Sequence, residues 1–393
     1  MIPVSWDGGA QGLLTFDGMG RRRNVIVAVT NDLATDQRVE RSCSLLHEMG
    51  FNVLLIGRRL KQSPAIPQRP YSLRRMMLPW SRGPMFYAAF NLRLFCFILW
   101  RRADLIVAND LDTLLPCFLV SRIRGIPLVY DSHEYFTGVP ELEGRPVVRR
   151  VWKGLERRLF PRLRYLVTVN ASIATLYEQE YGKRPAVVRN VPRRRERSSG
   201  GQRPAELPPS GRLIILQGAG INVDRGAEEA LQAMAHLDHA HMIIVGGGDV
   251  IPRLKALREE AGLQDRVHFF PRMPYEELMR YTEAADIGLS LDKATNINYR
   301  FSLPNKVFDY IQAGIPILCS ELPEVAGLVR EYELGLVTPS HEPEVIAGLL
   351  EQMLGDEARR RIWKENLNIA SRTLCWENEK ETLREIYATA CNA

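Results

Sequence analysis

The chain has 393 residues, of which 46% are hydrophobic and 25% are charged. This length allows two domains, each with its own core, and the composition is that of an ordinary globular protein. The six cysteines form no C-x-x-C pair, and no metal-ligand spacing of Cys or His occurs. We therefore expect reduced thiols in a cytoplasmic protein and no metal site. The sequence predicts neither a signal peptide nor a helix approaching the ~20 apolar residues that span a bilayer.

The charge is distributed unevenly along the chain. Residues 1–195 contain 31 Lys and Arg against 16 Asp and Glu, a net charge of +15, whereas residues 196–393 contain 21 against 30, a net charge of −9. A basic first half suggests an anionic partner such as lipid head groups or a lipid-linked phosphate. No nucleic-acid recognition motif is present, so we do not expect a nucleic-acid partner. The alternative is a chain that is simply rich in arginine.

A first domain is expected over residues 21–195, after a glycine-rich tail over residues 1–20 that is predicted to be disordered. Short apolar runs that alternate with helical patterns predict a parallel, doubly wound sheet. The turn after the first strand lacks G-x-G-x-x-G, which argues against a dinucleotide oxidoreductase. A long basic loop is expected over Arg58–Pro84. The predicted strands are Val25–Thr30, Val53–Ile56, Asp104–Ala108, Pro127–Tyr130, Tyr165–Val169 and Ala186–Arg189.

An apolar helix with basic ends is predicted over Met85–Arg102. A core helix is the default interpretation of such a pattern. The alternative is a helix whose apolar face enters a membrane surface while Arg93, Arg101 and Arg102 contact the head groups.

Polar residues follow two of the predicted strands of the first domain. Asp110 lies in N-D-L-D after one strand, and Asp131 and His133 lie in D-S-H-E after the next. Loops at the carboxyl ends of parallel strands are where open α/β sheets bind ligands. A lone histidine is more often structural, but this position makes His133 a candidate site residue.

Residues 196–211 are rich in Pro, Gly, Ser and Arg and predict an interdomain linker. A second α/β domain is expected over residues 212–374, followed by a final helix over residues 375–393. The predicted strands of this domain are Arg212–Gln217, Ile243–Val245, Val267–Phe270, Ile287–Leu291, Ile315–Cys319 and Gly335–Val337.

The stretch from Asn298 to Ser320 predicts a loop, a helix, a tight turn and a buried strand. We expect Ser302 to cap the helix, Pro304 to occupy its first turn and Gly314 to end it. Lys306 and Asp309 would then share one face of the helix. Free N–H groups and Lys306 could hold phosphate oxygens, and Asp309 could accept hydrogen bonds from ribose hydroxyls. The alternative is a capped helix with a solvated lysine.

This stretch resembles the donor-site signature S-x-P-x-K-x-x-[ED]-x-x-x-x-G-x-P of family 4 glycosyltransferases. The segments Gly218–Gly226, G-A-G-I-N-V-D-R-G, and Asn31–Val39, N-D-L-A-T-D-Q-R-V, resemble the same family's phosphate loop and opening loop. The resemblance implies the GT-B fold, in which two Rossmann-like domains face a cleft. It also implies that the final helix returns to the first domain.

The resemblance implies transfer of a sugar, with retention, from a UDP- or GDP-linked donor to a glycan or lipid-linked acceptor in polysaccharide or lipopolysaccharide synthesis. It implies no cofactor or essential metal, and a location in the cytoplasm or on the inner face of the membrane. The implied catalytic residues are His133, Arg225 and Lys306. The implied donor-binding residues are Gly218, Gly220, Gly248, Arg272, Met273, Leu303, Asn305, Lys306 and Asp309, and the acceptor-side residues are Asp36, Arg38, Asp110 and Asp131. For Asp36 and Arg38 the alternative is an acid at the start of a helix and a solvated arginine.

Two positions depart from the commoner family pattern. Phe301 stands where many relatives carry a Glu that contacts the transferred sugar, and Gly220 stands where many carry an Arg. One sugar contact and one phosphate cation of that pattern are therefore missing. A sugar-nucleotide epimerase of the same fold and a non-catalytic binding subunit remain the alternative functions.

Overall fold

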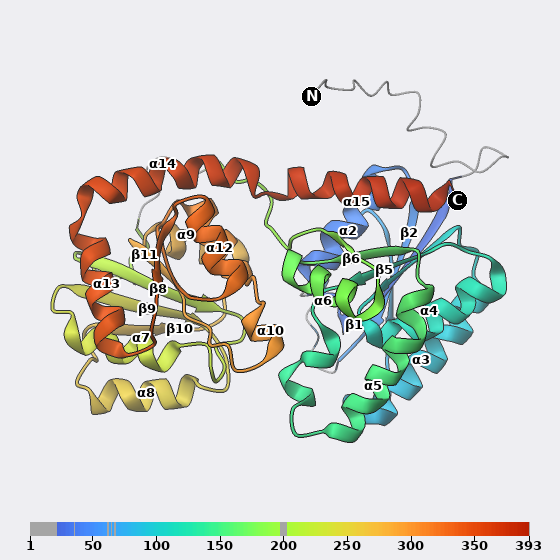
Figure 1. The fold of residues 1–393 in the computed structure, drawn as a ribbon, viewed down its shortest axis with the longest axis horizontal. Helices are drawn as coiled ribbons and strands as arrows, with labels where there is room; N and C mark the ends of the chain where they lie inside the picture. Colours follow the sequence, from blue (N-terminus) through green and yellow to red (C-terminus); the bar gives the residue numbers. More distant parts are fainter. Residues whose placement is uncertain are drawn as a thin grey trace. The chain divides into compact units, whose positions relative to one another are not determined.

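The structure is a computed structural model that describes residues 22–34, 36–60, 63, 65–66, 68–196 and 203–392. The expected tail over residues 1–20 lies outside this range. The described chain forms two compact units (Figure 1). Unit 1 contains the described residues up to Asn190 together with those from Glu379 onward, and unit 2 contains Val191–Asn378.

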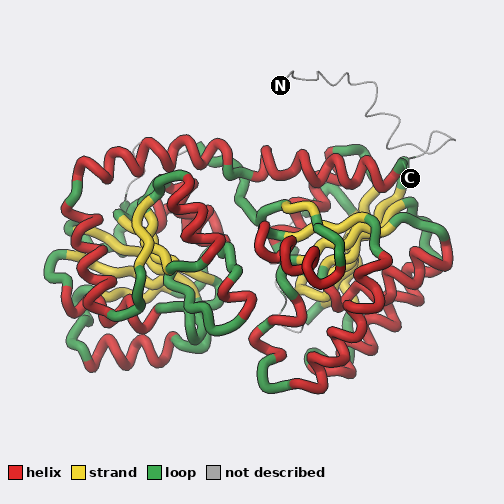
Figure 2. Tube along the Cα trace, in the orientation of Figure 1, coloured by secondary structure: helices red, strands yellow, loops and turns green. Residues whose placement is uncertain are grey.

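Unit 1 is built on a seven-stranded sheet in which every neighbouring pair of strands is parallel. The strands of this sheet are drawn in yellow in Figure 2. The three central strands are almost wholly buried on both faces, which explains why their sequences are continuous apolar runs. In spatial order the strands are β3 (Ser72–Met76), β2 (Asn52–Arg58), β1 (Asn24–Asp32), β4 (Leu105–Asn109), β5 (Leu128–Ser132), β6 (Tyr165–Thr168) and β7 (Ala186–Val187).

Helices cover both faces of this sheet (Figure 1). Helices α3, α4 and α5 lie side by side, while α2 and α15 lie together on the other side of the sheet. The α-helices of unit 1 are α2 (Gln37–Glu48), α3 (Gly83–Leu99), α4 (Leu111–Arg124), α5 (Pro146–Leu159), α6 (Ala171–Tyr181) and α15 (Trp376–Cys391), with short 3-10 turns η1 (Phe136–Gly138), η2 (Pro140–Leu142) and η3 (Phe160–Arg162).

The final helix, α15, packs into unit 1 from Glu379 onward. Tyr387 is fully buried, Lys380 forms an ion pair of 3.0 Å with Glu48, and Glu379 accepts a hydrogen bond of 2.8 Å from Arg189 Nε. The chain therefore leaves unit 1 once and returns to it with its last helix.

One strand of unit 1 lies where the sequence predicts only loop. Within Arg58–Pro84, residues Ser72–Met76 form β3 and pair with β2 at the edge of the sheet. The sequence S-L-R-R-M carries two adjacent arginines and no apolar alternation, so it lacks the usual signature of a strand. Charged residues are common on edge strands because only one side of the strand is paired.

Unit 2 is built on a six-stranded parallel sheet (Figure 2). In spatial order its strands are β10 (Val267–Phe270), β9 (Ala240–Gly246), β8 (Arg212–Gly218), β11 (Ile287–Ser290), β12 (Ile317–Ser320) and β13 (Gly335–Thr338). Its helices are α7 (Ala227–Ala233), η4 (Met234–His236), α8 (Ile251–Glu260), α9 (Tyr275–Glu283), α10 (Ile297–Arg300), α11 (Asn305–Ala313), α12 (Pro323–Glu331), α13 (Pro343–Gly355) and α14 (Glu357–Thr373). The predicted architecture of two doubly wound parallel sheets is confirmed.

Helix α11 begins later than the sequence predicts. Its first residue is Asn305, preceded by Pro304 in an extended conformation, so the prediction that Ser302 caps the helix is wrong. The reason is the short helix α10, which ends at Arg300 and places Ser302 directly after its last turn. At the other end Gly314 adopts a left-handed conformation with φ of 75°, which confirms the predicted stop.

The segment predicted as a linker, residues 196–211, is described only in part. On either side of the residues that are not described, Val191 and Leu207 are buried in unit 2, and Arg195 forms an ion pair with Glu276. The chain therefore packs against unit 2 from Val191, before the predicted start of the second domain at residue 212.

Candidate functional site

In unit 1 the ends of β4 and β5 are joined by a hydrogen bond. The backbone N–H of His133 donates to Asp110 Oδ1 at 2.8 Å. Asp110 has φ of 60° and ψ of 165°, a conformation that residues other than glycine rarely adopt. Such strained residues are concentrated at functional sites.

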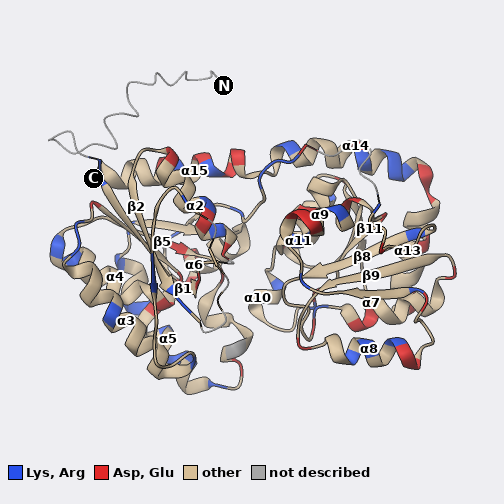
Figure 3. Cartoon of the chain, turned by 180° about the vertical axis from the view of Figure 1, so that it is seen from behind, with Lys and Arg blue, Asp and Glu red and all other residues tan. Residues whose placement is uncertain are grey.

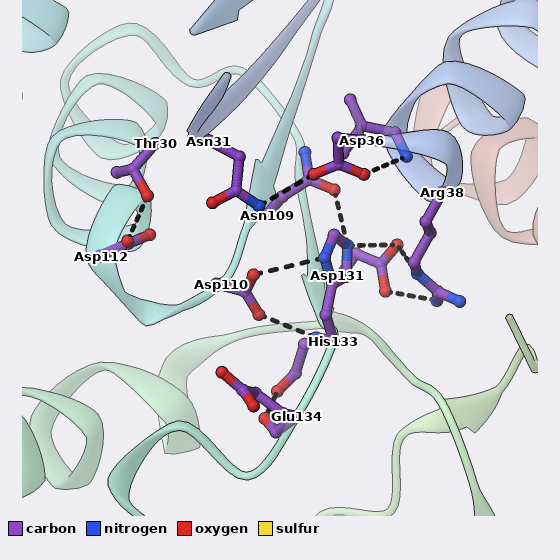
Figure 4. Close-up of polar contacts among 12 residues, drawn as sticks. Thr30, Asn31, Asp36, Arg38, Asn109, Asp110, Asp112, Asp131, His133 and Glu134 are labelled. Atoms are coloured by element: carbon purple, nitrogen blue, oxygen red, sulfur yellow. Dashed lines mark hydrogen bonds and ion pairs between the residues drawn. The ribbon is translucent and has the colours of Figure 1, made fainter. Parts of the chain in front are cut away.

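The His133 ring is held at both nitrogens (Figure 4). Nδ1 lies 3.3 Å from Asp110 Oδ2, while Nε2 lies 3.5 Å from Asp131 Oδ2 and 3.2 Å from Asn109 Oδ1. The side chain of His133 is 16% exposed. The ring is therefore fixed in place by groups of unit 1 alone.

A buried ion pair supports this arrangement. Arg38, on α2, donates to both oxygens of Asp131, from Nη2 at 2.7 Å and from Nε at 3.1 Å, and its Nη1 donates to the Val188 carbonyl at 2.8 Å. Arg38 is therefore not the solvated arginine that the sequence left open. We call His133, Asp110, Asp131, Arg38 and Asn109 the histidine cluster.

The charges of the histidine cluster set its protonation states. Burial lowers the pKa of His133, but the carboxylates of Asp110 and Asp131 outweigh burial and raise it to about 9. Burial also opposes ionisation of Asp131, but Arg38 and then His133 hold its pKa below the ordinary value. At Asp110 burial prevails over His133, and the pKa of that carboxyl is raised. At neutral pH His133 is therefore an imidazolium and not a proton acceptor.

Two further acids lie near the histidine cluster. Asp36 caps α2, accepting from the backbone N–H of Val39 at 3.0 Å, as one sequence interpretation predicted. Asp112, in the first turn of α4, accepts from Thr30 Oγ1, and burial and then Asp110 raise its pKa to about 8. Asp112 is not among the residues predicted from the sequence, although it lies in the same N-D-L-D stretch as Asp110.

In unit 2 the two predicted phosphate cations converge on one buried carboxylate. Asp292, two residues after the end of β11, is 1% exposed, and Arg225 Nη1 lies 3.4 Å from its Oδ2 while Lys306 Nζ lies 3.6 Å from its Oδ1. The Arg225 guanidinium also stacks over the Tyr299 ring at 4.1 Å. We call Arg225, Lys306 and Asp292 the cation cluster; it has two positive charges and one negative charge.

Only 10% of the Lys306 side chain is exposed, so the alternative of a solvated lysine is wrong. Its pKa is lowered, first by burial and also by the neighbouring Arg225, whereas Asp292 acts to raise it. An added anion at this position would relieve the unfavourable environment of the lysine.

A glycine holds Arg225 beside Asp292. Gly226 has φ of 69°, and a Cβ at this position would lie 2.1 Å from the Leu291 carbonyl oxygen. Asp224 accepts from the backbone N–H of Lys293 at 2.8 Å. The loop before α7 and the end of β11 are therefore locked together by backbone contacts that only glycine permits.

The predicted glycine loop packs closely against the loop after β9. A Cβ on Gly248 would lie 1.9 Å from the Ile221 carbonyl oxygen, and Ile221 N donates to Gly247 O at 2.9 Å. Packing between the two loops thus accounts for glycine at position 248. Gly218 ends β8, and the Asn222 side chain lies near the space where Gly220 would carry a Cβ.

The remaining predicted donor residues are near these loops or at the start of α11. Arg272 is exposed and donates to the Ala219 carbonyl; Asn305 is exposed at the first position of α11. Met273 and Leu303 are half-buried.

Asp309 belongs to a separate buried network. Its Oδ2 accepts from Gln217 Nε2 at 3.0 Å and its Oδ1 from the Tyr275 hydroxyl at 3.1 Å, while Thr282 Oγ1 donates to Gln217 Oε1 at 2.7 Å. Asp309 is 8% exposed. Two of its acceptor positions are thus occupied by protein groups, which fix the direction of the carboxylate.

Two family profiles match most of the chain. Residues 35–194 match the glycosyl transferase 4-like domain, and residues 201–368 match the glycosyl transferases group 1. The chain belongs to the group 1 glycosyl transferases. The predicted membership of family 4 is thereby confirmed.

Curated relatives of this glycosyltransferase are distant. It is 25% identical over 301 residues to the D-inositol 3-phosphate glycosyltransferase of Acidothermus cellulolyticus, covering 69% of this chain and 64% of that protein. It is 26% identical over 190 residues to the protein of the same name from Xylanimonas cellulosilytica, covering 47% and 44%. The chain thus spans from less than half to just under two thirds of the length of these relatives.

Solved structures agree over nearly the whole glycosyltransferase. Sucrose-phosphate synthase from Thermosynechococcus elongatus has a TM-score of 0.79 at 16% identity, covering 94% of this chain and 99% of that chain. HepE of Anabaena in complex with UDP has a TM-score of 0.70 at 16% identity, covering 93% and 100%. These likenesses confirm the GT-B fold.

The described part of the glycosyltransferase contains no helix that is long and apolar enough to cross a membrane. Among the same residues, no group of three or more His, Cys, Asp and Glu side chains is arranged to hold a metal ion.

Three residues of these networks, Asp292, Tyr299 and Gln217, are not among the site residues predicted from the sequence. Asp292 had an available signal, because it directly follows the predicted strand Ile287–Leu291, as Asp131 follows its own strand. Tyr299 and Gln217 had none, since each is recognised only through its contact with Arg225 or Asp309.

Proposed function

We propose that this chain transfers a glycosyl group from a UDP- or GDP-linked sugar to a hydroxyl group of an acceptor. The observation that carries the proposal is the cation cluster, in which Arg225 and Lys306 converge at the ends of two separate segments of unit 2. Its charges sum to a net positive value, so it is suited to a diphosphate, whose negative charge grows as the sugar leaves. The start of α11, with its free N–H groups, lies one residue before Lys306 and adds to this attraction.

In this proposal the nucleoside is bound by the network around Asp309. Gln217 and Tyr275 fix the direction of the Asp309 carboxylate, which would accept hydrogen bonds from the ribose hydroxyls. Arg272, Met273 and the loop that contains Gly218 and Gly220 would complete the donor site. The protein's own cations neutralise the diphosphate, and no metal or cofactor is required.

We further propose that unit 1 binds the acceptor through the histidine cluster and that the reaction retains the anomeric configuration. Because the pKa of His133 is raised to about 9, its ring already carries a proton at neutral pH. The acceptor's proton would therefore pass to the departing phosphate oxygen as the new bond to the anomeric carbon forms. A fixed imidazolium would orient polar groups of the acceptor without exchanging a proton.

We assign the acceptor to a glycan or lipid-linked saccharide in cell-surface polysaccharide or lipopolysaccharide synthesis. The curated relatives carry the name D-inositol 3-phosphate glycosyltransferase, which makes an inositol phosphate the competing acceptor. Either acceptor is compatible with the basic character of residues 1–195.

The proposal includes a peripheral contact between unit 1 and an anionic membrane. Helix α3 buries Phe86, Phe90, Leu94 and Ile98 along one face, and its opposite face also carries apolar residues. The large exposed apolar side chains of α3 and the residue after it are Met85 at 55%, Leu92 at 66% and Trp100 at 85%. An apolar face flanked by arginines is typical of helices that lie in a membrane surface.

Arginines accompany this face. Lys and Arg residues mark α3 and α5 in Figure 3. Beside α3 is a cavity of ≈ 580 Å³ lined by Arg74, Arg75, Met76, Met77, Arg93 and Phe97. Its mixture of guanidinium and apolar groups suits an anionic lipid head group above its acyl chains.

The proposal is tested by incubating the purified chain with UDP-glucose, UDP-galactose, UDP-N-acetylglucosamine and GDP-mannose, with and without EDTA. Slow release of free UDP or GDP from one donor, unchanged by EDTA, is the expected result. Interconversion of the nucleotide-sugars without release would identify an epimerase. Binding without either reaction would identify a non-catalytic subunit, and no binding of any donor or nucleotide would overturn the proposal.

A further inference from the structure

Asp292 has unfilled capacity to accept hydrogen bonds. Its side chain is 1% exposed, yet among the described residues no protein group donates a hydrogen bond to Oδ1 or Oδ2. An ionised carboxylate has about four lone-pair positions, and buried polar atoms almost always have a partner. Unsatisfied buried oxygens at a strand end therefore indicate a ligand that supplies hydrogen-bond donors.

Asp292 is not simply the partner of a structural ion pair. Where this chain builds such a pair, between Arg38 and Asp131, the guanidinium donates to both oxygens at 2.7 and 3.1 Å. At Asp292 the two cations lie farther away, at 3.4 and 3.6 Å, and outside hydrogen-bonding geometry. The attraction of the two cations therefore positions the Asp292 carboxylate but leaves its hydrogen-bond acceptor positions unfilled.

The position of the carboxylate is also fixed. Gly226 packs against the Leu291 carbonyl, Lys293 N donates to Asp224 O at 2.8 Å, and Tyr299 stacks on Arg225 at 4.1 Å. The backbone on both sides of Asp292 is thus held, and the Arg225 guanidinium beside it is stacked on an aromatic ring. A ligand entering this site meets a prearranged acceptor.

We propose that Asp292 accepts hydrogen bonds from hydroxyl groups of the transferred sugar, while Arg225 and Lys306 hold the diphosphate. This inference rests on the proposed function and assigns the sugar-recognition residue of its donor site. Phosphate oxygens carry no proton to donate at neutral pH and are repelled by a carboxylate, whereas sugar hydroxyls donate readily. Within one cluster the cations therefore recognise the phosphates and the anion recognises the sugar.

The first test compares Asp292→Asn with the wild type by calorimetry, using UDP, GDP and the four nucleotide-sugars named above. The variant is expected to lose about tenfold or more in affinity for the preferred nucleotide-sugar, since hydrogen bonds to a charged group are worth that much. Its affinity for the free nucleotide should stay equal or rise, because a negative charge near the phosphates is removed. Glu321→Gln, at an exposed carboxylate that follows another strand of the same sheet, is the matched control and should change neither affinity.

Equal losses for free nucleotide and nucleotide-sugar in Asp292→Asn would overturn the inference, because they would make Asp292 a counter-ion only. Failure of the wild type to bind any nucleotide or nucleotide-sugar would instead overturn the proposed function itself. The two failures are thus distinguishable.

A second test begins with the wild type, so that its first result does not depend on the folding of a variant. Monodeoxy analogues of the preferred donor sugar are compared with the parent donor. At least one analogue should bind about tenfold more weakly, and Asp292→Asn should no longer distinguish that analogue from the parent. Equal binding of every analogue by the wild type would contradict a hydrogen bond from the sugar to Asp292.

Discussion

The two charged clusters of this glycosyltransferase differ in how completely the protein satisfies them. In the histidine cluster, both ring nitrogens of His133 and both oxygens of Asp131 have partners within unit 1. In the cation cluster, both oxygens of Asp292 lack a hydrogen bond from the described residues. The first cluster is complete without a ligand, and the second is incomplete.

The difference indicates different tasks. A saturated network in a buried setting is rigid, because moving any member leaves charges unpaired. It can position a surface for an acceptor but has little capacity left to bind phosphate. The cation cluster instead has an excess of positive charge at Lys306, whose pKa is lowered mainly by burial. A bound diphosphate would compensate this charge. Stability should therefore depend on the histidine cluster, and ligand affinity on the cation cluster.

The largest effect is expected from Asp131→Asn in the histidine cluster. Removing one charge leaves Arg38, which is 4% exposed, without its ionic partner. Breaking a buried ion pair typically costs about 3–5 kcal/mol in the free energy of unfolding. The measurement is native-state hydrogen exchange of β4 and β5 across a urea series.

The matched control is Glu178→Gln, which breaks an exposed pair with Arg184 on the same unit. Exposed pairs contribute about 0–1 kcal/mol, so this variant should unfold almost as the wild type does. If Asp131→Asn is no more destabilising than Glu178→Gln, the histidine cluster does not stabilise the folded state.

The second prediction concerns Lys306→Met in the cation cluster. Loss of a charge-assisted contact should weaken binding of UDP or GDP by about 10- to 100-fold, corresponding to about 1.5–3 kcal/mol. The unliganded protein should change by less than ~1 kcal/mol, because the substitution also removes repulsion between Lys306 and Arg225. Calorimetric titration measures the nucleotide affinity, and thermal unfolding measures the stability of the unliganded protein.

Lys364→Met, at an exposed lysine on α14, controls for loss of a positive charge from unit 2 and should leave nucleotide affinity unchanged. An unaltered affinity of Lys306→Met for UDP, GDP and ADP alike would remove Lys306 from the donor site.

Only some of the features that distinguish the two clusters could be predicted from the sequence. The alternation of strands and helices was readable because each element is encoded locally, and so was the Lys306 segment, whose glycine and apolar period mark helix and turn. The burial of Lys306 was not readable, since it results from Asp292 and Arg225 in distant segments. Arg38 was equally ambiguous, because only the folded sheet brings Asp131 and the Val188 carbonyl to it.

Two errors have local causes. Strand β3 was missed because its edge position permits charged residues, which remove the alternating pattern. Ser302 was taken as a helix cap because nothing in the sequence indicated α10 just before it. Both errors occur where a neighbouring element, and not the residues themselves, determines the conformation.

The third prediction concerns the pH dependence of unit 1 and Asp112, which has a pKa raised to about 8 from an ordinary value of 3.8. Between these values the folded state keeps a proton that the unfolded state has released. The free energy of unfolding should therefore fall as pH rises, by about 1.4 kcal/mol per pH unit from this group. Asp112→Asn should remove this slope.

The measurement is urea unfolding of wild type and Asp112→Asn between about pH 4.5 and 6.5, below the range in which His133 adds a slope of the same sign. The exposed Asp249→Asn in unit 2 serves as the control and should leave the slope intact. Parallel curves for Asp112→Asn and wild type would mean that Asp112 is ionised in the folded protein.

The smallest change in affinity is expected on the outer face of α3, where large apolar side chains are exposed. Met85, Leu92 and Trp100 are exposed to water without a covering element, just as Asp292 lacks donors inside unit 2. If an anionic bilayer is the missing partner, Arg101→Gln and Arg102→Gln should each weaken binding to phosphatidylglycerol vesicles by about fivefold, since an arginine near such a surface is worth about 1 kcal/mol.

Binding to the same vesicles should also fall as salt rises, because charges at a membrane surface are screened within about 10 Å at 0.1 M salt. Leu92→Gln tests the apolar contribution, and Ile369→Gln, at an exposed apolar residue on α14 of unit 2, is its control. If vesicle binding falls with salt but is unchanged by Leu92→Gln, the contact is purely electrostatic and the apolar side chains do not contribute. Absence of vesicle binding at low salt would overturn the proposed membrane contact, because both the arginines and the exposed apolar side chains of α3 should act most strongly there.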